Sequence, residues 1–122
     1  YRYGGLVRSG AVFGIGSDAP MGSIDPFHAI YCAVERKDYD DGPEARFYPK
    51  ERLPMKDAVY AYTMGSAAVC GMDSEIGSIE TGKSADMVHV SRDIFTIETD
   101  SLREMETLHT VVEGDVVWEK KQ

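Results

Sequence analysis

The sequence lacks an excess of basic residues and lacks any long apolar run. Its 13 Lys and Arg are outnumbered by 21 Asp and Glu, which gives a formal net charge of −8. A protein that binds nucleic-acid phosphates needs a basic surface, so this balance excludes that class. The apolar runs are only a few residues long, far short of the about 20 residues of a membrane-spanning helix. We therefore expect no nucleic-acid partner and no membrane contact.

The chain also lacks a signal-peptide pattern and has few cysteines. Residues 1–5 contain no basic region that leads into an apolar one. Cys32 and Cys70 lie in helix-like stretches, which fits free, packed thiols in a cytosolic protein better than a disulfide scaffold. We therefore expect a cytoplasmic protein. The 122 residues begin with Tyr1 rather than Met, so we expect a single domain or part of one, cut or trimmed from a longer protein.

The pattern of apolar and turn-forming residues predicts an α/β chain with a β tail. Asp25 is a typical N-cap, and Pro26 favours the first turn of a helix that runs to Arg36. The polar stretch 37–52 is a loop of a length that is usually functional or mobile. The other predicted elements are a helix end at 3–9 stopped by Gly10, a buried strand at 11–16, a helix from Pro54 to Cys70 with Gly65 as its weak point, a strand at 87–90, a helical turn at 101–105, and a hairpin of strands 108–112 and 116–119 around Gly114-Asp115.

A glycine-rich motif follows the first predicted strand. Residues 14–19 match G-x-G-x-x-A, the turn that leads directly into a phosphate-binding helix in dinucleotide-binding folds. Here Pro20, Gly22 and the capping Asp25 delay the helix beyond that point. No second strand carries an acid about 20 residues later, as that fold requires. The context of the motif therefore disfavours nucleotide binding.

Asp18 lies at the carboxyl end of the predicted strand 11–16. Ligand and metal sites form at that end of a parallel sheet or barrel, but an aspartate in a turn often only caps the following loop. Both interpretations stay open on local chemistry. His28 is the histidine nearest to this loop, whereas His89 and His109 fall in predicted strands and are expected to be structural or surface residues. The histidines show no metal-ligand spacing with one another or with the cysteines.

Seven short segments, in order along the chain, carry a family resemblance. The most specific one is G-S-I-E-x-G-K-x-A-D at residues 77–86. The segments are 16–20, 25–27, 33–36, 49–53, 58–63, 76–86 and 110–117. With them the chain resembles the C-terminal part of the amidohydrolase superfamily, in particular the branch that contains N-substituted formamide deformylases.

The resemblance implies a metal-bearing (β/α)8 barrel joined to a β-sandwich that is made from both chain ends. Residues 1–72 would form the last strand and outer helices of the barrel, and residues 73–122 would supply strands of the sandwich. Residues 11–16 would then be the eighth barrel strand. Asp18 would be a metal ligand at the mouth of the barrel and the general base that takes a proton from water and passes it to the leaving amine.

The implied activity is hydrolysis of a non-peptide C–N bond in a small amide or formamide-like substrate, with a divalent metal, expected to be zinc. Ser17, Pro20 and His28 would border the substrate pocket. The family's H-x-H pair is missing, and one carboxylate cannot replace the about four ligands of zinc. We therefore expect this chain alone to bind no metal tightly, to be inactive, and to form homo-oligomers through exposed helix faces. The alternative is a non-catalytic interaction module derived from the same fold.

Overall fold

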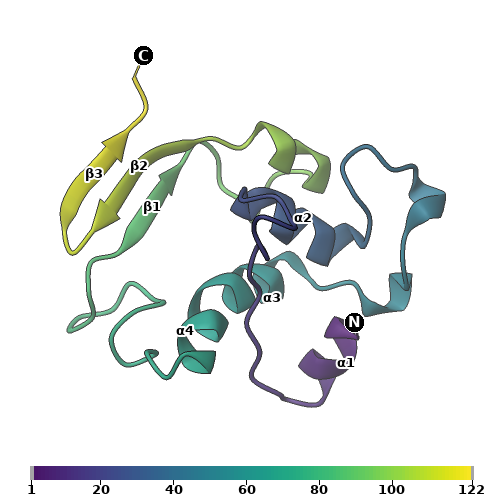
Figure 1. Ribbon diagram of the computed structural model, residues 1–122, viewed down its shortest axis with the longest axis horizontal. Helices are drawn as coiled ribbons and strands as arrows, with labels where there is room; N and C mark the ends of the chain where they lie inside the picture. Colours follow the sequence, from purple (N-terminus) through teal and green to yellow (C-terminus); the bar gives the residue numbers. More distant parts are fainter. Residues whose placement is uncertain (1, 122) are drawn as a thin grey trace.

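The computed structural model describes residues 2–121 and places a group of helices beside a three-stranded sheet (Figure 1). The helices are α1 (Tyr3–Arg8), α2 (Pro26–Glu35), α3 (Met55–Tyr60) and α4 (Ser66–Val69), and the strands are β1 (Met87–Val90), β2 (Thr107–Val112) and β3 (Asp115–Glu119). Short 3-10 helices lie at Pro43–Ala45 (η1), Pro49–Glu51 (η2) and Thr99–Glu104 (η4). The chain is thus a small α/β unit with a β tail, as predicted. In residues 2–121 no helix has both the length and the apolar character needed to cross a membrane.

Helix α2 begins and ends where the sequence predicts. Asp25 Oδ1 accepts a hydrogen bond from the Phe27 N–H at 2.9 Å, and Pro26 occupies the first turn. This cap satisfies one of the free N–H groups that every helix start presents. The helix stops at Arg36, whose φ of 57° is left-handed. The short helix end predicted at 3–9 is likewise present as α1, and Gly10 follows it with a φ of 73°.

The predicted helix from Pro54 to Cys70 is present, but its middle differs from a regular α-helix. Between α3 and α4, residues Ala61–Gly65 (η3) form a π-helical turn. A π turn leaves some carbonyl groups without their usual partners inside the helix. Here the Ala61 carbonyl accepts a hydrogen bond from the Ile15 N–H at 3.0 Å, and Ser66 Oγ donates to the Ile15 carbonyl at 3.0 Å. The chain before α2 is therefore docked onto this turn.

The predicted strand at 11–16 is wrong. These residues are extended but belong to no sheet. A strand forms only where a second strand supplies the other half of its hydrogen-bond ladder. Here the Ala11 N–H donates to the Leu6 carbonyl of α1, and the Ile15 N–H donates to the π turn. Gly65 allows this close approach, since a Cβ there would lie 2.3 Å from the Phe13 carbonyl oxygen. We name residues 11–16 the docked segment.

The sheet has the strand order β1-β2-β3, with both pairs antiparallel. The predicted strand at 87–90 and the predicted hairpin are therefore confirmed. The hairpin loop is one residue earlier than predicted, because Val112 pairs with Asp115 and leaves Glu113 and Gly114 as the two loop residues. Their φ values of 52° and 91° match the turn type that follows the right-handed twist of the strands. The helical turn predicted at 101–105 is present as η4.

The core lies where α2, α3 and η4 meet. It consists of eight buried side chains, namely Ile30, Tyr31, Ala33, Val34, Leu53, Ala58, Leu102 and Met105. Residues from both sides of position 72 contribute to this core. The boundary at position 72 between a barrel part and a sandwich part stays a prediction. Leu102 and Tyr31 are almost completely buried, so η4 closes the core over α2.

Buried carboxylates hold the 37–52 loop against the helices. Glu35, at the end of α2, binds Arg46 at 2.6 Å through one oxygen and Arg52 at 2.7 Å through the other. Arg52 also donates from Nε to the Val34 carbonyl at 2.8 Å. Buried charges are costly unless they are paired, and this carboxylate has two cationic partners. The loop is therefore tied at several points to the helix that precedes it.

Candidate functional site

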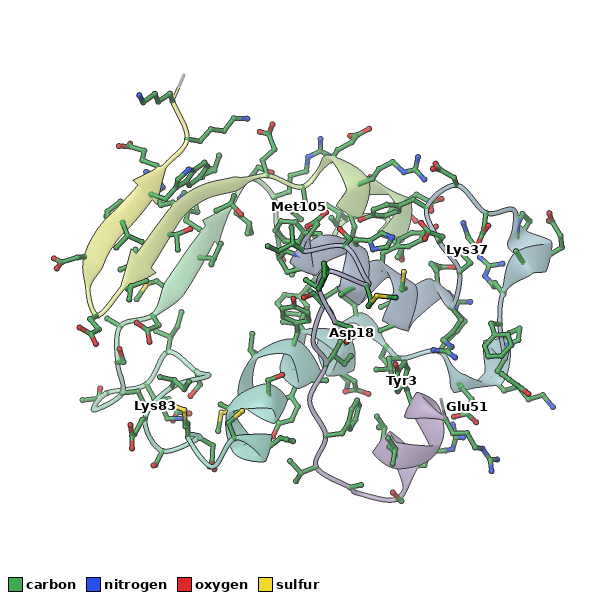
Figure 2. The ribbon with its side chains drawn as sticks, viewed as in Figure 1. Tyr3, Asp18, Lys37, Glu51, Lys83 and Met105 are labelled. Atoms are coloured by element: carbon green, nitrogen blue, oxygen red, sulfur yellow. The ribbon has the colours of Figure 1, made fainter. Side chains whose placement is uncertain are left out.

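Asp18 follows the docked segment and lies near the centre of the view, where the chain passes from α1 towards α2 (Figure 2). Its φ is 53°, a left-handed conformation that short polar side chains tolerate better than most others. Its main-chain carbonyl accepts hydrogen bonds from the N–H groups of Met21 at 2.8 Å and Gly22 at 3.1 Å. Asp18 itself is exposed.

The loop after Asp18 is held without the carboxylate of that residue. Ser17 Oγ accepts the Ala19 N–H at 3.3 Å, and the peptide bond between Ala19 and Pro20 is cis. The remaining turn bonds go to the main-chain carbonyl of Asp18. Within residues 2–121 the Asp18 side chain makes no hydrogen bond or ion pair. The Asp18 side chain therefore does not cap this loop, and its role as a ligand stays a prediction.

A pocket of about 240 Å³ lies between the docked segment and α2. Ser17 and His28, both predicted to border a substrate pocket, line it together with Gly16, Ser23 and Cys32. Asp18 and Pro20 are not among its lining residues. A larger cavity of about 680 Å³ lies at α1 and η2 and is lined by other residues, namely Arg2, Tyr48, Pro49, Lys50 and Glu51. The structure thus brings together two of the four predicted site residues in one pocket.

His28 points to the 37–52 loop through a pair with Asp38. Its Nε2 lies 3.0 Å from Asp38 Oδ1, and because a carboxylate only accepts, Nε2 donates. This hydrogen bond, followed by one from the Tyr39 N–H, lowers the pKa of Asp38 below its usual value. The sequence could not reveal this pair, since the position of Asp38 depends on how the 37–52 loop folds back.

Cys32 lies beside this pair but is not activated by it. Its Sγ is 3.8 Å from the same Nε2 of His28. Burial and then the charge of Asp38 raise the pKa of the Cys32 thiol, so the thiol stays protonated near neutral pH. Both cysteines are free, as predicted. Cys70, which was expected to be packed, is exposed because α4 ends at Val69 and the chain turns away there.

The described residues do not form a metal centre. No group of three or more His, Cys, Asp or Glu side chains in residues 2–121 is placed to hold a metal ion. Zinc takes about four ligands in proteins, and Asp18 presents a single carboxylate. The donors in this part of the chain therefore do not fit a complete catalytic metal site.

Lys83 is a residue whose role the sequence did not reveal. It belongs to the motif 77–86, which pointed to a family but not to a contact. Its side chain is only 9% exposed, and Nζ donates to the Asp73 carbonyl at 2.5 Å and to Ser78 Oγ at 2.7 Å. Lys83 therefore fastens the loop between α4 and β1. The spacing of Lys83 and Ser78 inside one turn-rich motif was the signal that could have indicated this contact.

Known proteins resemble the chain over nearly its whole length. The model of the Amidohydrolase family matches residues 1–118. YtcJ of Bacillus subtilis (strain 168), which is named as an amidohydrolase, is 35% identical over 115 residues, which cover 94% of this chain and 22% of YtcJ. The N-substituted formamide deformylase of Arthrobacter pascens is 32% identical over 115 residues, which cover 94% of this chain and 21% of that protein. The chain thus spans about a fifth of the length of these curated relatives.

Solved structures show the same fold. An amidohydrolase from Thermotoga maritima MSB8 superposes with a TM-score of 0.64 over 94% of this chain and 25% of its own, at 19% identity. The guanine deaminase of E. coli gives a TM-score of 0.64 over 96% of this chain and 30% of its own, at 22% identity. The family match and the sequence relatives confirm the resemblance stated from the segments above. The chain belongs to the amidohydrolase family.

Proposed function

We propose that the chain is the C-terminal segment of a longer metal-dependent hydrolase that cleaves a non-peptide C–N bond, in an amide or formamide-like small molecule. The family membership supports this class of reaction. The relatives are named for deformylation and for deamination, and both remove a group from nitrogen or carbon by breaking a C–N bond. Because the chain spans about a fifth of its curated relatives, most of the active site would lie outside the described residues.

The observation that carries the proposal is the exposed carboxylate of Asp18 at the end of the docked segment. A general base needs a carboxylate that is free to take a proton from water, and Asp18 has no competing partner within residues 2–121. We propose that Asp18 is this base and one ligand of a divalent metal, zinc by family resemblance. Since this part of the chain holds no complete donor set, the other ligands would come from the rest of the longer protein.

The pocket beside Asp18 supports a place for the substrate. Ser17 and His28 line it, and Pro20 lies in the loop that follows Ser17. We propose that these residues border the substrate and do not react with it. In the same proposal residues 1–72 belong to the barrel part of the fold and residues 73–122 to the sandwich part.

The test is the substitution Asp18→Asn in the longer protein that contains this chain, assayed with a panel of formamides and small amides. Loss of the general base should lower kcat by about 10²- to 10⁴-fold, with circular dichroism unchanged because the side chain is exposed. Asp73→Asn is the matched control, since Asp73 is also an exposed loop aspartate. Equal activity of the Asp18→Asn variant and the wild-type protein would refute the assignment.

The second candidate is a non-catalytic interaction module. It is favoured by large apolar side chains that are left in solvent, such as Met21, Ile24 and Ile79, each more than four-fifths exposed. Isolated exposed apolar residues are normal, so this candidate requires that such side chains form a contiguous patch in the longer protein. This candidate predicts that the longer protein has no hydrolytic activity towards any of the amides, with or without Asp18.

A further inference from the structure

The sheet carries a row of three polar side chains whose residues are register partners, with His89 on β1, His109 on β2 and Glu119 on β3. Nδ1 of His89 lies 3.0 Å from Nδ1 of His109. The two ring planes are parallel within 2°, and their centroids are 5.3 Å apart. The centroid separation exceeds the N–N distance by the radii of the two rings, so the rings meet edge to edge with the nitrogens facing each other. One Nδ1 then carries a proton, and the other offers a lone pair.

Glu119 determines which ring nitrogen of neutral His109 carries the proton. Nε2 of His109 lies 3.3 Å from Glu119 Oε1. Because a carboxylate accepts hydrogen bonds, Nε2 carries the proton of a neutral His109 and leaves Nδ1 as the lone-pair nitrogen. Histidines that bind metals usually donate their second N–H to a carboxylate in this way, which fixes the ring and makes it more basic. His109 thus has the arrangement that is usual for a metal-binding histidine.

The imidazole donors and the short distance between the two nitrogens are compatible with one class of cation. If an ion lay about 2.0 Å from each nitrogen and the nitrogens stayed 3.0 Å apart, the nitrogen–ion–nitrogen angle would be about 90°. Among divalent first-row ions, affinity for nitrogen ligands rises through Ni²⁺ to its highest value at Cu²⁺. A right angle is typical of the tetragonal coordination of Cu(II) and Ni(II) by nitrogen and oxygen ligands. On metal binding the Nδ1 proton of His89 would leave and Nε2 of the same ring, which is exposed, would take up a proton, so that Nδ1 gains a lone pair. The rings would then turn about their Cβ–Cγ bonds so that both lone pairs meet at the ion.

The site is open to solvent. His89 and Glu119 are exposed, and His109 is half-buried, so an ion and its water ligands can reach the nitrogens. The formal charge of −8 also raises the local concentration of cations around the chain. The row lies between two irregularities of the ladder, one at His89/Val90 and one at Thr110/Val111. Such bulges fix the direction of neighbouring side chains.

We propose that His89 and His109 form a two-histidine chelate for Cu²⁺ or Ni²⁺ across β1 and β2, with Glu119 orienting His109 and water completing the coordination. The proposal does not rest on the proposed hydrolase activity. It has a practical consequence for that activity, because metal found on this chain would not by itself identify the ligand role of Asp18.

The test is a titration of the tag-free 122-residue chain with NiCl₂, in which isothermal titration calorimetry measures the binding. We expect saturable binding of one Ni²⁺ per chain. His89→Asn and His109→Asn should each weaken it by more than the about tenfold expected for Glu119→Gln, which removes only the orienting carboxylate. Glu113→Gln, which removes an exposed carboxylate of the same hairpin, is the control and should bind as the wild-type chain does. Electron paramagnetic resonance of the Cu²⁺ form should show two coupled imidazole nitrogens.

Two results would overturn the proposal. One is the absence of saturable Ni²⁺ binding, and the other is equal affinity of the wild-type chain and the His109→Asn variant. Circular dichroism checks that each variant is folded. If a histidine variant does not fold, Glu119→Gln and the Cu²⁺ spectrum of the wild-type chain still decide, because a spectrum with one nitrogen or none contradicts the chelate.

Discussion

At the scale of single residues, Glu51 joins two segments that are far apart in the sequence. Its Oε2 accepts the Gly5 N–H at 2.7 Å, and its Oε1 lies 3.2 Å from the Arg8 guanidinium. The main-chain hydrogen bond, more than the arginine charges, lowers the pKa of Glu51. Gly4 packs against the main chain of Glu51, where an added Cβ would lie 3.2 Å from the Glu51 Cα. Helix α1 is therefore fastened to η2 by one ionised carboxylate.

This carboxylate should make stability depend on pH. A lowered folded-state pKa means that its contribution is complete above the unfolded value, about 4.3, and is lost as the pH falls through the folded value. The free energy of unfolding of the wild-type chain should fall below about pH 4.5 in part because Glu51 is protonated. The Glu51→Gln variant should lack this part of the decrease. Urea unfolding between pH 3 and pH 7 measures it. Glu44→Gln, at an exposed position of η1, should keep the wild-type pH dependence. An unchanged dependence in the Glu51 variant would contradict the expectation.

At the scale of elements, the docked segment depends on the absence of a side chain at Gly65. Alanine there would place Cβ 2.3 Å from the Phe13 carbonyl oxygen, so the segment must move. We expect Gly65→Ala to destabilise the chain by about 1–3 kcal/mol, the usual cost of overpacking. Gly16→Ala is the control, because nothing lies within 4 Å of its added Cβ, and it should change stability by less than about 1 kcal/mol. Thermal unfolding of both variants tests the difference, and equal stabilities would argue against the docking contact.

Elements that depend on local chemistry were predictable from the sequence, whereas those that depend on a distant partner were not. The start of α2 follows from Asp25 and Pro26, which act within one turn. The docked segment has the composition of a strand but takes its partner from η3, about 50 residues later. The hairpin was predicted, yet its loop was one residue off because nothing in the sequence marks the positive φ of Glu113.

The residues of the candidate site likewise fall into those that the sequence could indicate and those that it could not. Asp18 could be singled out because it ends a run of small residues before a loop, and its exposed carboxylate agrees with that interpretation. The pairs His28–Asp38 and His89–His109 could not be predicted. The first needs the path of the 37–52 loop, and the second needs the register of a strand pair that is 20 residues apart in the sequence. The sequence therefore indicated which side chains have the right chemistry, but not which side chains they contact.

At the scale of the whole molecule, apolar side chains on the helices remain uncovered. Tyr60 and Val69, on α3 and α4, are 54% and 62% exposed, and an uncovered apolar face favours association. We expect the isolated chain to form homo-oligomers as its concentration rises, and Tyr60→Ser with Val69→Ser to shift it towards the monomer. Light scattering over a concentration series measures this. Phe95→Ser, at an exposed turn position outside the helices, should leave association unchanged, and a monomer at every concentration would refute the expectation.

The contacts of Lys83 also concern how the three-stranded sheet is connected to the helices. The ammonium binds carbonyls and a hydroxyl of residues 73–78, while Gly77 lies against Ala67 and Met64 of the preceding helical run. The chain that leaves α4 is thereby folded back onto the helix. It reaches β1 along a fixed path and not through a free tether. We therefore expect the loop between α4 and β1 to transmit a displacement of β1 to the helical run, as a flexible linker would not.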